Sequence, residues 1–421
     1  MGISARECAL RALINIAKNG AYSDKAVDAA LSGTSFDARD RALVTNIVYG
    51  TVSNRLLLDY RIQNASKIKI KKMDTAVREI LRSAVYQIFL LEKIPDSAAV
   101  NEAVKLAKKY ASRSVGFINA VLRGVIAAGE ILPDKNDVTA YLSIKYSYPE
   151  WMVRKWLDEL GAEQCEQLLN AGNQNPPVTV RVNSLKTDSD NLCNIMDFTK
   201  TEVDGALVST QKGSLADCDE FKNGLYSIQD TASQLAVLTL SPEAGDRVLD
   251  VCAAPGGKTT HMAELMQNEG EIIAWDIYEH KTDIIKKAAD RLGITIIKPE
   301  LHNAKDLVPE YKESFDKVLV DAPCSGLGII RKKPDIKWQR TEESIQSLAG
   351  EQKEILETAC TYVKKGGQLL YSTCTITPEE NMDRVNEFIS THKDFELLSA
   401  KTLYPHKDGT DGFFISLLKR R

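Results

Sequence analysis

The sequence predicts a mostly parallel, doubly wound α/β domain, preceded by an all-helical domain and a small α+β module. Apolar strand patterns alternate with helical patterns from about residue 226 to the end, and such alternation is typical of a parallel sheet with helices on its faces. Residues 5–128 carry helical periodicity alone, and a strand pattern first follows the helix-breaking Asn175-Pro-Pro177. We therefore expect domains at residues 1–130, 141–225 and 226–421.

The helical front shows its clearest pattern after Asp74, which stands where a helix N-cap would. The apolar residues between Val77 and Ile88 fall on one helical face. Further helical patterns cover Ala5–Lys18, Arg39–Val52 and Ser97–Lys109. The connection before Asp74 is rich in lysine, with Lys67, Lys69, Lys71 and Lys72. Lysines in a loop suit phosphate contacts, although a solvated loop explains them nearly as well.

The middle of the chain begins with a linker over residues 129–140. The aromatic stretch from Tyr146 to Trp156 opens a helix, in which we expect Trp151 and Trp156 to pack between domains rather than stack on bases. A strand is expected over residues 178–184, and short strand and helix patterns continue to about residue 225. These patterns predict the small α+β module.

The C-terminal half carries the patterns of the α/β domain. Strands are expected at residues 247–251, 271–276, 294–298, 315–321 and 367–372, with helices at 278–292 and 341–364. The tail at 411–418 suits a final antiparallel strand.

A glycine turn, Cys252-Ala-Ala-Pro-Gly-Gly-Lys258, joins the first of these strands to a helix. A P-loop would need glycine where Cys252 stands, and the dinucleotide fingerprint G-x-G-x-x-G is absent. What remains is a strand carrying Asp250, a turn that lets a ligand approach the backbone, and a second strand ending in Asp276. An acid at that place can accept both hydroxyls of a ribose. Strand, turn, helix and acid together favour a nucleoside-type site over an ordinary loop.

Composition sets further bounds. Of the 421 residues, 43% are hydrophobic, no apolar run is long enough to span a membrane, and the first residues lack the apolar core of a signal peptide. The eight cysteines form no C-x-x-C pair, so we expect no metal site. A large chain without a signal is expected to be cytoplasmic with free thiols, and we expect a monomer. Residues 1–140 hold 21 Lys/Arg against 14 Asp/Glu, whereas the remainder is acidic. A basic front suggests a polyanionic partner, with a solvated helical surface as the equal alternative.

These motifs resemble those of a known enzyme family. The turn and Asp276 resemble the S-adenosyl-L-methionine site of class I methyltransferases, and residues 252–258 are similar to the RNA cytosine-C5 subgroup, the RsmB/NOP family. Residues 36–43 and 115–123 resemble the NusB-like RNA-binding domain, while 181–186 and 227–233 resemble segments that precede the catalytic domain in that family. This order of parts implies a bacterial enzyme that methylates C5 of one cytidine in 16S small-subunit ribosomal RNA.

Two cysteines follow neighbouring strands, in Asp321-Ala-Pro-Cys324 and in Ser372-Thr-Cys374. The carboxyl ends of strands in open α/β sheets face the ligand. C5 of cytosine is a poor nucleophile, but a thiolate added at C6 makes C5 enamine-like. A base must later remove the C5 proton so that the thiolate can leave. One cysteine can attack and the other can assist release, and the spacing alone leaves open which does which.

The family resemblance implies a role for each thiol. DNA cytosine methyltransferases attack with the cysteine that follows the equivalent of Pro323, whereas the RNA enzymes use the one that follows the equivalent of Thr373. The resemblance therefore implies Cys374 as the nucleophile and Cys324 as the release residue. Asp321 would hydrogen-bond N3 or N4 of the base.

Further residues follow from the same resemblance. Lys258 would lie close to the target base, the basic stretch 330–338 would hold the RNA backbone beside the extruded base, and residues 378–381 would support the Cys374 loop. The cofactor would be bound by Cys252, Ala253, Ala254, Pro255, Gly256, Gly257, Lys258, Asp276, Asn303 and Asp321. Asn303 stands where the family has an acid, although an amide can still hydrogen-bond adenine.

Two other interpretations remain open. A transfer-RNA cytosine methyltransferase shares the catalytic domain, and the NusB-like front argues against it. A non-catalytic RNA-binding assembly factor would carry the same front. The candidate site argues against that factor, because it retains Cys324, Cys374, Asp276 and Lys258. A site without catalytic activity would have no chemical need for both thiols.

Overall fold

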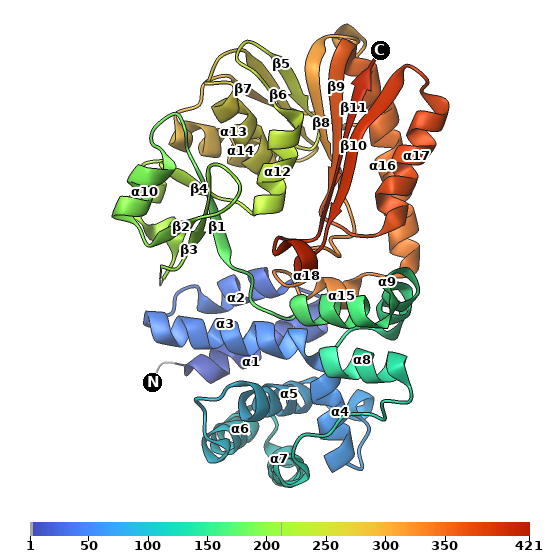
Figure 1. Cartoon of the computed structure of the whole chain (residues 1–421). Coiled ribbons are helices and arrows are strands. Elements are labelled where there is room, and N and C mark those ends of the chain that lie inside the picture. The colour runs from blue at the N-terminus through green and yellow to red at the C-terminus, as the bar shows by residue number, and fades with distance from the viewer. Residues whose placement is uncertain (1–2, 212) are drawn as a thin grey trace. The chain divides into compact units, whose positions relative to one another are not determined.

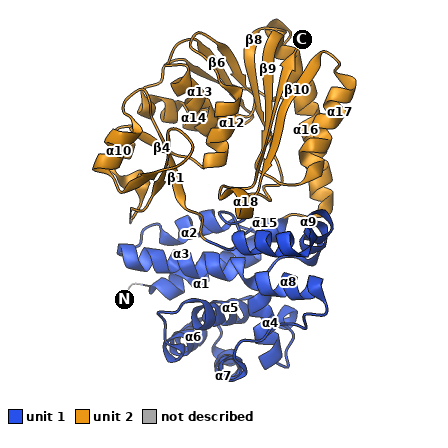
Figure 2. Ribbon diagram, in the orientation of Figure 1, with its two compact units in different colours: residues 1–174, 330–339 blue, residues 175–329, 340–421 orange. Residues whose placement is uncertain are grey.

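The computed structural model describes residues 3–211 and 213–421, and the chain forms two compact units (Figure 2). Unit 1 comprises residues 1–174 and 330–339, and unit 2 comprises residues 175–329 and 340–421. The change of unit at residue 175 falls inside the stretch 141–225 that the sequence suggested as one module. The helices α8 (Val138–Tyr146) and α9 (Glu150–Ala171) belong to unit 1.

The described residues of unit 1 form helices joined by loops, which confirms the all-helical front (Figure 1). Its remaining long helices are α1 (Ala5–Asn19), α2 (Ser23–Leu31), α3 (Ala38–Ser53), α4 (Arg55–Ala65), α5 (Thr75–Leu90), α6 (Asp96–Tyr110) and α7 (Val115–Ala128). The apolar face predicted on α5 is buried, with Ile80 and Leu81 fully enclosed. Asp74 occupies the N-cap of α5, but its side chain makes no capping hydrogen bond.

The segment 330–339, called the inserted segment below, folds within unit 1 and contains the short helix α15 (Ile336–Gln339). Asp335 accepts hydrogen bonds from the backbone N–H and the hydroxyl of Ser23, at 3.1 and 2.8 Å. The Lys337 ammonium donates to Asn173 Oδ1 at 2.6 Å, and this lysine is only 1% exposed. Burial lowers the pKa of Lys337 well below its ordinary value. The expectation that this whole stretch lies along RNA is therefore wrong for Lys337, which packs inside the protein.

Unit 2 begins with a small antiparallel sheet, which agrees with the predicted α+β module. The strands β1 (Val178–Val182), β2 (Phe198–Lys200), β3 (Ala206–Ser209) and β4 (Tyr226–Ile228) lie in the order β2-β3-β1-β4. The helices α10 (Ser189–Ile195) and α11 (Asp219–Lys222) accompany them. Alternate residues of β1, such as Val180 and Val182, are buried in a local apolar cluster.

A seven-stranded sheet forms the body of unit 2, in the order β10-β11-β9-β8-β5-β6-β7 (Figure 1). The strands β5 (Arg247–Asp250), β6 (Glu271–Asp276), β7 (Ile297–Leu301), β8 (Phe315–Asp321) and β9 (Val363–Thr373) are parallel. β11 (Phe413–Arg420) runs antiparallel to β9 and to β10 (Phe395–Leu403), which confirms the antiparallel tail. Apolar residues of α12 (Thr231–Leu240), α13 (Gly257–Leu265) and α14 (Glu279–Leu292) cover one face; α16 (Glu342–Ala359) and α17 (Met382–Thr391) cover the other.

Two boundaries of the α/β domain differ from the prediction. β7 begins three residues later than expected, because Ile294 still closes the C-terminus of α14 by donating its N–H to Ala289 O. α16 ends at Ala359, and β9 already begins at Val363. None of the described helices is both long enough and apolar enough to cross a membrane.

Candidate active site

The carboxyl ends of the parallel strands carry the polar residues that the sequence singled out. Asp250, Asp276 and Asp321 end β5, β6 and β8, and Cys374 follows β9. The strand order reverses at β5, since β6 and β7 lie on one side of it and β8 and β9 on the other. Ligands of open α/β sheets bind at such a reversal. The predicted neighbourhood of the two cysteine-bearing strand ends is therefore confirmed.

The glycine turn leaves β5 and enters α13. Gly256 has φ 99°, a left-handed conformation that only glycine adopts readily, and its N–H donates to Ala253 O at 2.8 Å. Asp250 is 1% exposed, and its Oδ2 accepts the hydroxyl of Thr259 at 2.7 Å. Burial raises the pKa of Asp250 to about 7. Among the described residues its Oδ1 has no hydrogen-bond partner.

A cavity of about 230 Å³ opens above this turn. Its wall contains Asp250, the residues from Cys252 to Pro255, Gly257, Lys258 and Asp321. The remaining wall comes from Ile228, Gln229, Asp230 and Ser233, which the sequence had marked only as a family-like segment without a role. A glycine turn at a helix start and an unpartnered buried carboxylate oxygen fit a nucleoside-type cofactor that brings its own donors.

Asp276 and Asn303 follow the next two strands outward from the turn. Asp276 Oδ1 accepts the N–H of Tyr278 at 3.1 Å, and its Oδ2 lies 3.6 Å from Lys281 Nζ. The Asn303 side-chain oxygen accepts the N–H of Lys305 at 3.2 Å. Both stand beyond the cavity wall, on the side of β5 away from the cysteines.

On the other side of β5, a chain of polar contacts joins Lys258, Asp321 and Ser372. Lys258 Nζ donates to Asp321 Oδ2 at 2.7 Å, and the Ser372 hydroxyl donates to Asp321 Oδ1 at 2.8 Å. Burial opposes the charged form of Lys258, but the adjacent Asp321 carboxylate outweighs it and raises the pKa of Lys258. The lysine therefore stays cationic and fixes the carboxylate of Asp321 at the cavity wall.

The two cysteines lie next to each other. Cys324 Sγ is 2.9 Å from Cys374 Sγ and also accepts the backbone N–H of Cys374 at 3.3 Å. Both are free thiols of intermediate exposure. The pKa of Cys324 is raised well above its ordinary value, first by the hydrogen bond with Cys374 and then by burial. Cys324 therefore holds its proton at neutral pH.

Glu380 holds the two cysteine loops together. The sequence predicted only that residues 378–381 support the Cys374 loop. This carboxyl group is fully buried and accepts the N–H of Ser325 at 2.8 Å and the amide of Gln352 at 3.0 Å. It also accepts the hydroxyl of Thr377 at 2.8 Å. Its neighbour Asn381 donates to Thr375 O at 3.1 Å. These contacts fix both thiols on one rigid platform.

The small sheet contributes a residue to the turn that sequence reasoning missed. Arg181 of β1 is 1% exposed and donates to Gly257 O at 2.7 Å and to Thr260 Oγ1 at 3.1 Å. It is balanced by Glu264 of α13, whose two oxygens lie 2.8 Å from Arg181 nitrogens. The sequence marked residues 181–186 as family-like, but an arginine in a strand pattern gives no sign that it reaches a distant helix.

Comparison with known proteins identifies each part of the chain. Residues 237–419 match the family model described as 16S rRNA methyltransferase RsmB/F, residues 3–127 match the NusB family, and residues 148–208 match the ferredoxin-like domain of RsmF/B-like methyltransferases. A Bacillus subtilis (strain 168) protein named probable ribosomal RNA small subunit methyltransferase B is 40% identical over 99% of both chains. A Vibrio cholerae ribosomal RNA small subunit methyltransferase B is 32% identical over 100% of this chain and 98% of its own.

Solved structures are similar as well. The crystal structure of PH0851 has a TM-score of 0.83 and 29% identity, covering 100% of both chains. A methyltransferase homologue from Pyrococcus horikoshii has a TM-score of 0.61 and 28% identity, covering 68% of this chain and 99% of its own. The chain therefore belongs to the RsmB/F family of 16S rRNA methyltransferases, S-adenosylmethionine-dependent enzymes of the cytosine-C5 type.

Proposed function

We propose that this protein methylates C5 of one cytidine in 16S ribosomal RNA, with Cys374 bonding to C6 and Cys324 serving release. The observation that carries the proposal is the pair of thiols 2.9 Å apart, beside the Lys258–Asp321 contact and the glycine turn. Covalent catalysis of this kind splits one difficult step into two easier ones. The NusB match at residues 3–127 and the full-length rRNA relatives favour ribosomal over transfer RNA.

The attack step uses the strand end of β9. Cys374 would add to C6 as a thiolate, its proton having passed to solvent, and the addition would make C5 electron-rich enough to accept a methyl group. Asp321, held by Lys258 and Ser372, would face N3 or N4 of the base, and a proton shared with N3 would offset the charge that develops on the ring. Lys258 would keep that carboxylate in place beside the base.

The release step follows from the coupling between the thiols. The hydrogen bond with Cys374 is the largest cause of the raised pKa of Cys324. Once Cys374 is a thioether, it carries no charge, so this cause disappears and the pKa of Cys324 falls, while burial still raises it. Cys324 can then pass its thiol proton to water and take the C5 proton, after which Cys374 leaves C6 as a thiolate. The same contact thus raises the pKa of Cys324 before attack and no longer does so afterwards.

The cofactor would lie along the turn and the neighbouring strand end. The backbone of residues 252–258 approaches it closely, and Asp250 Oδ1 offers an acceptor that no described residue satisfies. Asp276 would accept the ribose hydroxyls, and the amide of Asn303 would meet the adenine end. S-adenosyl-L-methionine supplies the methyl group as a sulfonium when bound.

The test compares two single variants with radiolabelled S-adenosylmethionine and 16S rRNA on a denaturing gel. Cys324→Ala should still attack and methylate but stall at release, so a protein–RNA adduct containing labelled methyl should accumulate. Cys374→Ala should give neither adduct nor methyl transfer. An adduct from Cys374→Ala and none from Cys324→Ala would reverse the two roles.

Two further variants control this experiment. The double variant should give no adduct, because attack precedes release. Asp276→Ala keeps both thiols but should lose most of its calorimetric affinity for S-adenosylmethionine and transfer no methyl. Undiminished cofactor affinity in Asp276→Ala would contradict the assignment of that acid.

A further inference from the structure

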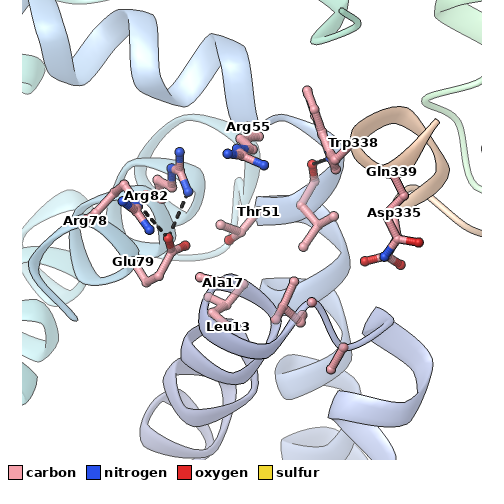
Figure 3. A pocket seen from close by; sticks show the side chains of 14 residues that line it. Leu13, Ala17, Thr51, Arg55, Arg78, Glu79, Arg82, Asp335, Trp338 and Gln339 are labelled. Carbon is pink, nitrogen blue, oxygen red and sulfur yellow. Dashed lines mark hydrogen bonds and ion pairs between the residues drawn. The ribbon is translucent and has the colours of Figure 1, made fainter. Parts of the chain in front are cut away.

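Unit 1 contains a cavity (Figure 3) and a groove that shares part of its lining, and neither belongs to the active site described above. The cavity measures about 210 Å³, and the groove measures about 710 Å³. They share three residues of α4 and α5, namely Arg55, Arg78 and Arg82. The inserted segment completes the cavity wall with Asp335, Trp338 and Gln339. We call the two together the arginine groove.

The three arginines are not equivalent, because two of them are neutralised within unit 1. Arg82 pairs with both oxygens of Asp59, at 2.7 and 2.6 Å, and with Glu79 at 2.8 Å. Arg78 pairs with Glu79 at 3.1 Å. Arg55, in contrast, donates no hydrogen bond to any described residue and lies with its guanidinium 5.2 Å from the Trp338 ring centroid.

The carboxylates nearest to Arg55 are already paired with the other two arginines, Asp59 with Arg82 and Glu79 with Arg78 and Arg82. Burial lowers the pKa of Arg55 and the like charge of Arg82 lowers it further, while the attraction of Asp59 and Glu79 offsets only part of this. The arginine groove also carries Lys67, Lys69 and Lys71, all exposed, so its six cations face the carboxylates of Asp59, Glu79 and Asp335 only. The Thr51 hydroxyl on the cavity wall is buried and has no hydrogen-bond partner among the described residues. An unpaired guanidinium, an unused hydroxyl and a row of lysines are the donors that an oxyanion requires.

We propose that the arginine groove binds the phosphodiester backbone of RNA, with Arg55 as the ligand of one phosphate and the lysines 67, 69 and 71 following the next ones. The inference rests on the proposed function for the choice of RNA as the polyanion. Several cations lining one groove suit a chain of phosphates better than a single ion does. The half-buried Trp338 beside Arg55 adds an aromatic surface of the kind that unpaired bases contact.

The segment that completes this site continues directly from the loop that carries Cys324. Trp338 and Asp335 belong to the inserted segment, which begins one residue after the Cys324 loop ends at Ile329. Within that loop, Gly328 donates its N–H to Cys374 O at 3.0 Å and accepts the N–H of Gly412 at 2.9 Å. A side chain added at Gly328 would overlap the backbone of Gly412. The wall of the phosphate site is therefore tethered by a few covalently linked residues to the platform that holds both thiols.

The experiment measures RNA affinity against salt for the full-length protein by fluorescence anisotropy. Two labelled probes are used, a 16S rRNA transcript and an oligouridylate that is no substrate. Losing one phosphate contact should lower the slope of log K against log salt by about 0.7 to 1. We expect Arg55→Gln to lower it by this amount with both probes and to weaken binding roughly ten-fold at low salt. Arg55→Lys should retain most of the slope.

Arg113→Gln is the matched control, since it removes an exposed arginine of unit 1 that lines neither part of the arginine groove. Its slope should equal that of the wild type. Thermal unfolding midpoints and S-adenosylmethionine affinity should be the same in all variants, because Arg55 holds no hydrogen bond in the fold. An Arg55→Gln slope equal to that of Arg113→Gln would overturn the inference. Failure of the wild type to methylate C5 would instead contradict the proposed function. The comparison of salt slopes between the variants on oligouridylate would remain valid.

Discussion

At the scale of single residues, Asp250 links the turn to the pH dependence of stability. Its pKa in the folded protein is raised to about 7 by burial, above the ordinary value of 3.8. A raised pKa means that the folded state prefers the protonated carboxyl. The stabilisation is therefore complete below about pH 4 and is lost as the pH rises through about 7.

We expect Asp250→Asn to gain stability relative to the wild type as the pH rises from 4 to 7. The gain should approach about 1.4 kcal/mol for each pH unit crossed, because the amide imitates the protonated carboxyl and can still accept the Thr259 hydroxyl. Urea unfolding at several pH values without cofactor measures it. Asp283→Asn, at an exposed position of α14, serves as the control. A difference between Asp250→Asn and wild type that is constant across this range would contradict the expectation.

The residues that the sequence identified are those whose chemistry is local to a motif. Cys324, Cys374 and the turn at 252–258 each follow a strand pattern, so the parallel sheet alone places them at one edge. Arg181 and Lys337 could not be found in this way. Each is a charged residue whose buried partner lies far away in the sequence, and only the tertiary fold shows that Lys337 is enclosed rather than offered to RNA.

At the scale of elements, the turn that precedes α17 supports the thiol platform. Glu380 accepts hydrogen bonds from Ser325, Gln352 and Thr377, which lie on the Cys324 loop, on α16 and after β9. Removing the carboxyl group leaves the Ser325 N–H buried without an acceptor, and such a group costs about 1–3 kcal/mol.

Glu380→Ala should therefore lower the free energy of unfolding by about 3 kcal/mol and reduce methyl transfer more than cofactor affinity. Glu380→Gln should cost less, about 1 kcal/mol, because one amide oxygen can still accept the N–H while the hydroxyls of Ser325 and Thr377 rotate to accept from the amide nitrogen. Denaturant midpoints and calorimetry with S-adenosylmethionine measure both effects. Asp383→Asn, exposed on α17, is the control. Equal losses of cofactor affinity and of turnover would show that Glu380 stabilises unit 2 as a whole rather than the thiol platform.

The element boundaries that the sequence misplaced have a physical reason in common. Ile294 and Cys360 are apolar or small residues at a change of element, and periodicity does not tell a buried helix end from a strand start. β10 was not predicted at all, because this edge strand is mostly exposed and its residues do not alternate cleanly between polar and apolar. Edge strands are partly exposed and therefore tolerate polar residues, so their sequence pattern is weak.

At the scale of the whole molecule, the inserted segment belongs to unit 1 although the residues before and after it in the sequence belong to unit 2. The sequence predicted three consecutive stretches, whereas residues 330–339 fold with residues 1–174. A local pattern cannot show this, because Asp335, Lys337 and Trp338 find their partners at Ser23, Asn173 and Val52. Removing residues 1–140 would thus leave the segment without two of these partners.

We expect a fragment of residues 1–174 to unfold at a lower temperature alone than with a synthetic peptide of residues 328–341. The peptide should restore the contacts of Ser23, Val52 and Asn173, and binding to the folded state raises its stability. Thermal unfolding at increasing peptide concentration measures the effect. A peptide with Trp338→Ala should bind at least about ten-fold more weakly, because it loses the indole contact with Val52 O. No shift of the midpoint with the unaltered peptide would contradict the expectation.

The inserted segment also bears on how such a protein can be inherited. Ten codons in the middle of the catalytic half of the gene encode a wall of the helical half. Recombination that exchanged the first 174 codons as one block would bring in new helices from that part of the chain. The helix α15, which folds with them, would still be encoded by the original gene. The two halves of this gene must therefore change together at Ser23, Val52, Asn173 and the segment that meets them, even though more than 150 residues of chain separate the last of these positions from that segment.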